Sequence, residues 1–182
     1  MSSWKARMTT LTFGLAIAVL RLTGSAGEAA AGALPKDPCT LLKSAEIQVL
    51  APNAKIGSGV SNAMAPMGVG CTYTWGPSTR EWGESALTIT VIDASRAWPG
   101  TSPDVIQQGI FAMVKVGGPN ASLVPGVGDA AAFTFEARSS NATAQAYLKA
   151  KGVHLSVKYH AGDALSSKDK VVALLKAAAA KL

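Results

Sequence analysis

Apolar and polar residues alternate in several short segments of the chain, and this period of two restricts the possible folds most strongly. Residues 153–160 are the clearest case, because every odd position is apolar (Val153, Leu155, Val157 and Tyr159). In a strand these side chains share one face, and the polar residues between them share the other. Similar patterns predict strands at residues 71–75, 86–92, 130–135 and 144–150. We therefore expect an antiparallel sheet of about five strands.

Three other segments predict helices: residues 41–50, whose apolar pattern is mixed and favours a short helix, and residues 102–114 and 167–182, whose apolar residues recur at helical spacing. The second begins with Ser102-Pro103, which favours a helix start, and its predicted buried stripe is Val105, Ile106, Ile110, Phe111 and Val114. Residues 57–70, rich in Gly and Pro, are expected to form a loop. The predicted order is helix-strand-strand-helix-strand-strand-strand-helix, a single α+β domain whose sheet is covered by helices on one side.

The first thirty residues have the layout of a secretory signal peptide. Lys5 and Arg7 form a short positive region, and an uninterrupted run without charge follows at residues 11–20. A transmembrane helix needs about 20 apolar residues to cross the hydrocarbon layer, and this run is half that length. We expect the segment to direct export and not to anchor the mature chain in a membrane.

Small residues near the end of this segment fit cleavage after Ala26 or after Ala31, of which we favour Ala31. The sequence is then divided into a signal peptide at residues 1–31 and one exported domain at residues 32–182. Its removal takes away three basic residues and one acidic residue, so that the net charge falls from +6 to +4. The remaining positive charges are scattered, so nucleic-acid binding is not expected.

The two cysteines of the chain, Cys39 and Cys71, both lie in the predicted mature part. In an oxidising compartment, two cysteines in a small domain usually form a disulfide, and we predict one here. The alternative is a redox-active or metal-binding thiol pair, but the spacing is not Cys-x-x-Cys and neither cysteine has a histidine near it in sequence. Two cysteines also cannot supply a four-cysteine zinc site or iron–sulfur cluster.

The sequence carries no recognisable catalytic or metal-binding pattern. His154 and His160 both fall on the polar face of one predicted strand, roughly 20 Å apart, and are expected to be solvated surface residues. Ser58 lies between two glycines without the strand-turn-helix context of a nucleophile. Met64 and Met67 could bind a soft metal, but packing of their loop on the sheet is the preferred interpretation. We predict no catalytic residue, no metal and no cofactor.

Three residues are candidates for a binding surface: Trp82, Trp98 and Asp129. The two tryptophans lie in predicted turns, where an exposed ring often marks a contact site, whereas Trp75 is expected in the core. Asp129 ends the segment Gly126-Val127-Gly128-Asp129. The glycines favour a tight turn whose backbone Asp129 would bind, and ligand binding is the alternative.

Several of these segments together resemble a known family. Asp37-Pro38-Cys39-Thr40-Leu41-Leu42, then residues 45–47, 70–75 and 124–133, are similar to a family of small exported bacterial proteins of unknown function, many of them lipoproteins. The resemblance spans residues 37–182 and implies a PsbP-like α+β fold and a non-enzymatic envelope or secreted domain. It brings no catalytic residues. The chain departs from the lipoproteins because no lipobox cysteine follows the apolar run.

These patterns favour a non-enzymatic secreted or periplasmic binding or interaction domain, stabilised by one disulfide. Its partner is expected to be an envelope protein or a small ligand, with no nucleic acid and no membrane span after processing. One alternative is a small hydrolase-like envelope enzyme built on the loops at residues 57–70, 76–85 and 123–129. Another is an envelope assembly or structural factor that uses Trp82 and Trp98 as a protein-contact patch.

Overall fold

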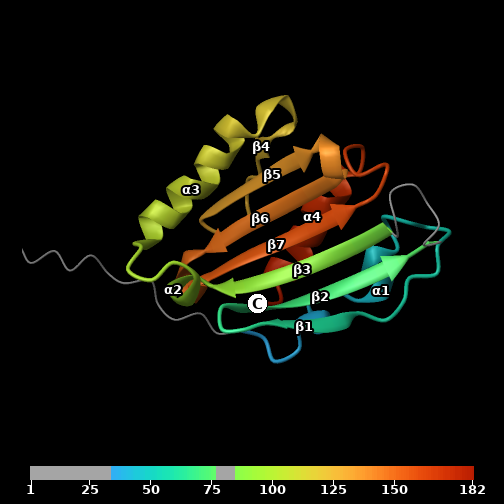
Figure 1. Ribbon diagram of the computed structural model, residues 1–182, viewed down its shortest axis with the longest axis horizontal. Helices are drawn as coiled ribbons and strands as arrows, with labels where there is room; N and C mark the ends of the chain where they lie inside the picture. Colours follow the sequence, from blue (N-terminus) through green and yellow to red (C-terminus); the bar gives the residue numbers. More distant parts are fainter. Residues whose placement is uncertain (1–33, 77–84) are drawn as a thin grey trace, which may run out of the picture.

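The structure is a computed structural model that describes residues 34–76 and 85–182. Within these residues a seven-stranded antiparallel sheet has the order β1-β2-β3-β7-β6-β5-β4 (Figure 1). The strands are β1 (Val60–Met64), β2 (Gly68–Trp75), β3 (Ser85–Asp93), β4 (Ser122–Leu123), β5 (Ala130–Glu136), β6 (Asn141–Leu148) and β7 (Val153–His160). The helices are α1 (Ser44–Ile47), α2 (Ala94–Ala97), α3 (Pro103–Val116) and α4 (Lys168–Ala179). Short 3-10 turns include η1 (Pro38–Thr40) and η4 (Lys149–Lys151).

The α+β class holds, but the predicted sheet of about five strands is wrong. The five predicted strands correspond to β2, β3, β5, β6 and β7, and the structure adds β1 and β4 at the two edges. All five residues of β1 are exposed, so neither face of this strand needs apolar side chains. The sequence of β1 therefore does not alternate between apolar and polar residues, and residues 57–70 are expected from the sequence to form a loop. The chain also departs from the expected PsbP-like order of elements, because three strands precede α3 and four follow it.

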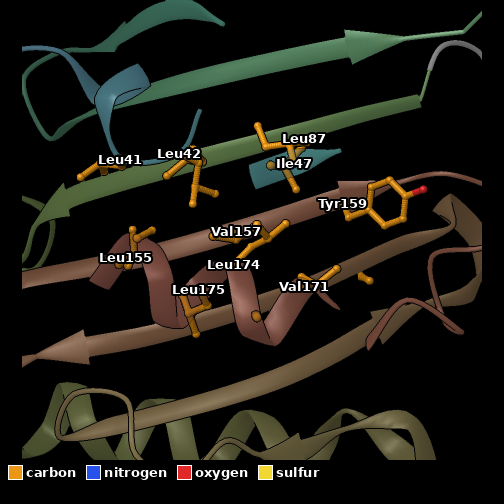
Figure 2. Packing of buried hydrophobic residues seen from close by; sticks show 14 of the residues in the cluster. Leu41, Leu42, Ile47, Leu87, Leu155, Val157, Tyr159, Val171, Leu174 and Leu175 are labelled. Carbon is orange, nitrogen blue, oxygen red and sulfur yellow. The ribbon is translucent and has the colours of Figure 1, made fainter. Parts of the chain in front are cut away.

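The main core lies on one face of the sheet, beneath α4, α1 and η1. Figure 2 shows side chains of α4 packed against those of the central strands, with Leu41, Leu42 and Ile47 beside them. The alternating apolar residues of β3 and β7 all point into this layer. The predicted packing of Trp75 in the core is confirmed, and its ring stacks on that of Tyr159 with centroids 5.9 Å apart.

The second face of the sheet is covered in part by α3, which corrects the prediction that the helices lie on one side. Ile106 and Ile110 of α3 pack on Ala130, Ala132 and Tyr147 of β5 and β6 in a smaller core. The predicted buried stripe of α3 is too wide: Val105 and Phe111 are 56% and 37% exposed. Only Ile106 and Ile110 of α3 are buried, so a narrow strip of the helix is in contact with the sheet.

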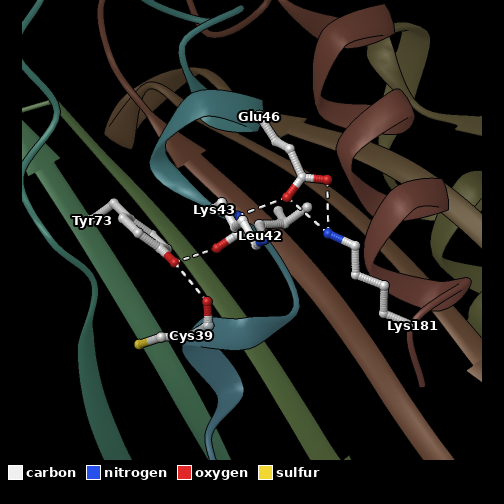
Figure 3. A network of polar contacts seen from close by, with 6 residues as sticks. All are labelled: Cys39, Leu42, Lys43, Glu46, Tyr73 and Lys181. Carbon is white, nitrogen blue, oxygen red and sulfur yellow. Dashed lines mark hydrogen bonds and ion pairs between the residues drawn. The ribbon is translucent and has the colours of Figure 1, made fainter.

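The predicted disulfide between Cys39 and Cys71 is confirmed and joins η1 to β2, with the two Cα atoms 5.1 Å apart. The Tyr73 hydroxyl donates to the carbonyl oxygens of Cys39 and Leu42, the former at 3.0 Å (Figure 3). Beside it, the Lys181 ammonium contacts the Glu46 carboxylate at 2.7 Å. This hydrogen bond lowers the pKa of Glu46. The contacts fasten the start of the domain to the sheet and to its last residues.

Residues 1–31, predicted as a signal peptide, lie outside the described residues. In the part of the chain that the structure does describe, none of the helices has the length and apolar character needed to cross a membrane.

Candidate functional site

A pocket of about 220 Å³ opens between the turn after α2, one side of α3 and β7. We call it the Trp98 pocket; its lining residues are Trp98, Thr101, Val105, Ile106, Gly109, Ile110, Met113 and His154. Ile106, Ile110 and His154 are buried and form its floor, whereas Trp98, Val105 and Met113 are exposed at its rim. The pocket is therefore reachable from solvent and mostly apolar inside, the usual character of a site for a small molecule.

Local interactions hold Trp98 at this rim. The buried Asp93 carboxylate caps α2 by accepting hydrogen bonds from the Ser95 backbone N–H and hydroxyl, at 3.0 and 2.7 Å. At the end of α2, the backbone N–H of Trp98 donates to the carbonyl oxygen of Ala94. The Trp98 and His154 rings meet edge to face, with centroids 5.7 Å apart. The indole thus lies beside the histidine and still exposes 37% of its surface.

The prediction that His154 is a solvated surface residue is wrong, since it is only 9% exposed. The alternation in β7 does place it on the face opposite the main core, but Trp98 and α3 cover that end of the face. Burial lowers the pKa of His154 to about 4, so that the ring is neutral at neutral pH. His160, at the other end of β7, hydrogen-bonds through Nδ1 to the Ser139 carbonyl at 2.8 Å.

Hydrogen bonds between neighbouring side chains determine which ring nitrogen of His154 carries the proton. Its Nε2 is 3.1 Å from the Gln145 Oε1, and the Gln145 Nε2 donates to the Met113 sulfur at 2.8 Å. Because an amide oxygen can only accept, Nε2 must carry the proton of the neutral ring. Nδ1 is then a bare acceptor, and within residues 34–76 and 85–182 it has no hydrogen-bond partner although it is buried.

The hydroxyl of Tyr147 is the second buried polar atom without a partner among the described residues. Tyr147 lies directly opposite His154 in the register of β6 and β7, on the same face of the sheet. Burial, followed by the negative charge of Asp129, raises the pKa of the Tyr147 hydroxyl. Buried polar groups are almost always paired, and leaving one unpaired costs about 1–3 kcal/mol. Two such atoms beneath α3 therefore single out this region.

The structure places the three candidate residues differently. Trp98 lines the pocket, and Trp82 lies outside the described residues. Asp129 lines a separate hollow and accepts a hydrogen bond from the Lys149 backbone N–H at 2.7 Å, which joins two segments of the fold. Asp129 and His154 thus line different hollows, and no group of three metal-binding side chains occurs in the described part of the chain.

A larger hollow, of about 650 Å³, lies at the other end of the sheet beside Trp75 and Tyr159. There the Tyr159 hydroxyl already donates to the Asp163 carboxylate at 2.7 Å. The hollow also ends at Gly76 and Ser85, where the described residues stop. The Trp98 pocket is the better candidate because all of its lining residues lie within the described parts of the chain and are mostly apolar.

The two glycines before Asp129 offer a matched test of their structural role. Both have positive φ angles, 76° at Gly126 and 56° at Gly128, but a Cβ added to Gly128 would lie 2.5 Å from the Tyr147 carbonyl oxygen, whereas one on Gly126 meets nothing within 4 Å. We expect Gly128→Ala to lower the free energy of unfolding by about 2 kcal/mol and Gly126→Ala by about 1 kcal/mol. Urea unfolding measures both, and equal losses would contradict the close approach.

Comparison of the chain with protein-family models, with curated proteins and with solved structures found no match. The resemblance to an exported PsbP-like family therefore stays a prediction, and the function is argued from the site.

Proposed function

We propose that this chain is an exported, non-enzymatic binding domain that takes a small molecule into the Trp98 pocket. The observation that carries the proposal is the Trp98 pocket itself, a mostly apolar hollow of about 220 Å³ that is reachable from solvent and has the buried His154 among its lining residues. A ligand that fills this hollow would remove apolar surface from water, so binding has a source of free energy.

The chemistry of the pocket favours holding a ligand over transforming it. A general base works best with a pKa near the ambient pH, and burial moves the pKa of His154 to about 4. In a Ser–His–Asp site a carboxylate orients the histidine, whereas the partner of His154 is the uncharged Gln145 amide. The imidazole is thus a weak base with a fixed tautomer, which suits recognition.

Export is supported by the signal-peptide pattern of residues 1–31 and by the Cys39–Cys71 disulfide. Disulfides persist in oxidising compartments such as the periplasm or the extracellular space, and thiols are kept reduced in the cytosol. A secreted or periplasmic location is therefore part of the proposal.

Titration of the chain from residue 32 onward with two neutral one-ring probes, phenol and fluorobenzene, tests the proposed function. We expect saturable binding of at least one probe in calorimetry, with NMR shifts at the amides of Ile106–Met113 and His154. The variant Gly109→Leu should weaken binding at least tenfold, because a Cβ on Gly109 meets nothing within 4 Å and the leucine would fill open space in the pocket.

Ala112→Leu is the matched control, because it adds bulk to the same helix at an exposed position that does not line the pocket. We expect this variant to bind the probes as the parent chain does. If neither probe binds the parent chain, or if Gly109→Leu binds both unchanged, the Trp98 pocket is not a binding site and the proposed function is wrong.

A further inference from the structure

We propose that two copies of this chain associate through the outer face of α3, with the two helices packed side by side and running in opposite directions. The inference goes beyond the proposed function and does not rest on it. It follows from three features of α3: its exposed apolar side chains, the symmetric order of the residues on its outer face, and the opposite charges at its two ends.

Exposed apolar side chains gather on α3 and beside it. Figure 1 shows α3 along the outside of the molecule, and only Ile106 and Ile110 of this helix are buried. Six large apolar residues of α3 and its surroundings are exposed: Trp98, Val105, Phe111, Met113, Val116 and Leu123. Val116 is the most exposed of them, at 84%. Clustered apolar side chains of this kind mark a surface for a partner, since covering them removes apolar area from water.

The outer face of α3 carries four residues that we call the α3 seam: Val105, Gly109, Ala112 and Val116. They follow one another at intervals of four, three and four residues, the spacing of a seam between two packed helices, and all four are exposed. The order is the same from either end, with valines outside and the two smallest residues in the middle. The space above Gly109 is open, because a Cβ added there meets nothing within 4 Å.

This symmetry makes the α3 seam complementary to itself. When two antiparallel copies are centred halfway along the seam, Val105 of each lies opposite Val116 of the other, and Gly109 of each lies opposite Ala112 of the other. The small residues then allow close approach in the middle, and the valines pack at the ends. A two-fold dimer requires one surface that is complementary to itself, so a second copy of this chain fits the seam.

The charges at the two ends of α3 favour the antiparallel direction. Asp104 lies in the first turn and Lys115 in the last, each one position before a valine of the seam and therefore on the same flank. Antiparallel copies bring Asp104 of one within a helical turn of Lys115 of the other, whereas parallel copies would bring like charges together. Asp104 is 73% exposed although it contacts Lys149, and Lys115 has no ion-pair partner in the described part of the chain. Such exposed charges set the orientation of partners more than their affinity.

Sedimentation of the chain from residue 32 onward tests the inference in an analytical ultracentrifuge. We expect a dimer that dissociates on dilution, with a dissociation constant on the order of 10 µM, because a single helix pair is a small interface. Val116→Lys places a charge opposite Val105 of the second copy and should raise this constant at least about tenfold. Val49→Lys is the matched control, the same change at another exposed valine away from α3, and should leave it unchanged. Both valines are exposed, so neither variant should unfold the chain.

Exchange of the two charges tests the direction of packing. Lys115→Glu should weaken the dimer about fivefold, because the new carboxylate lies near Asp104 of the second copy. Adding Asp104→Lys to this variant restores opposite charges and should return the dissociation constant to nearly that of the parent chain. A double variant that is weaker than Lys115→Glu alone would overturn the antiparallel arrangement.

A parent chain that stays monomeric at about 1 mM, or a Val116→Lys variant that dimerises as well as the parent, would overturn the inference. If the parent chain is monomeric and Val116→Lys instead lowers its binding to phospholipid vesicles, the exposed residues of α3 form a membrane surface and not a dimer interface. The proposed function is tested separately. Val116 does not line the Trp98 pocket, so Val116→Lys should still bind the aromatic probes as the parent chain does.

Discussion

The double variant Cys39→Ala/Cys71→Ala is expected to lose about 3–4 kcal/mol of unfolding free energy in urea denaturation. The disulfide joins residues separated by 32 positions, and in the chain-entropy model a loop of this length restricts the unfolded chain by that amount. Most small domains have about 5–15 kcal/mol of stability in total, so the loss is a large share. The midpoint of the transition should fall clearly.

Reductant supplies the control for this prediction. Adding it to the parent chain should lower the stability to nearly that of the double variant, and adding it to the double variant should have no effect. A parent chain that is as stable with reductant as without it would contradict a major role for the disulfide. The start of the domain would then be fastened by the Tyr73 and Lys181 contacts, which the variant leaves in place.

The central strands could be predicted because burial of one face gives their sequences a regular apolar pattern. In β3 and β7 one face packs into the main core, so their apolar residues recur at every second position. The same reasoning could not find β1, because an edge strand with all of its residues exposed carries no such pattern. Strand β4 has only two residues, too few for any periodicity.

The candidate site could be predicted only in part. Trp98 is indicated by its place in a turn, and the structure puts it at the rim of the pocket. His154 and Gln145 lie on what the sequence shows as the polar face of two strands, where a buried residue and a solvated one look alike. His154 and Gln145 are buried because α3, from another part of the chain, packs over that face of the sheet. The sequence alone does not show which face of the sheet a helix will cover. The only sequence feature that indicates a contact surface here is the wide apolar side of α3, from Val105 to Val116.

The burial of His154 predicts a specific loss of stability in acid. Its pKa is about 4 in the folded chain and about 6.5 when the ring is exposed to water, so between these values the unfolded state binds more protons. The contribution is complete above about pH 6.5 and is lost as the pH falls towards 4. It amounts to about 3 kcal/mol at pH 4.

Unfolding of the parent chain and of His154→Phe, measured from pH 7 to pH 4, isolates this contribution because the variant keeps every other titrating group. The parent chain should lose about 3 kcal/mol more than the variant over this range, most of it below pH 6. Tyr147, which lies opposite His154, stays uncharged throughout because its raised pKa is far above these values. Parallel pH profiles would mean that His154 is accessible to water in solution. They would contradict its burial at the floor of the Trp98 pocket.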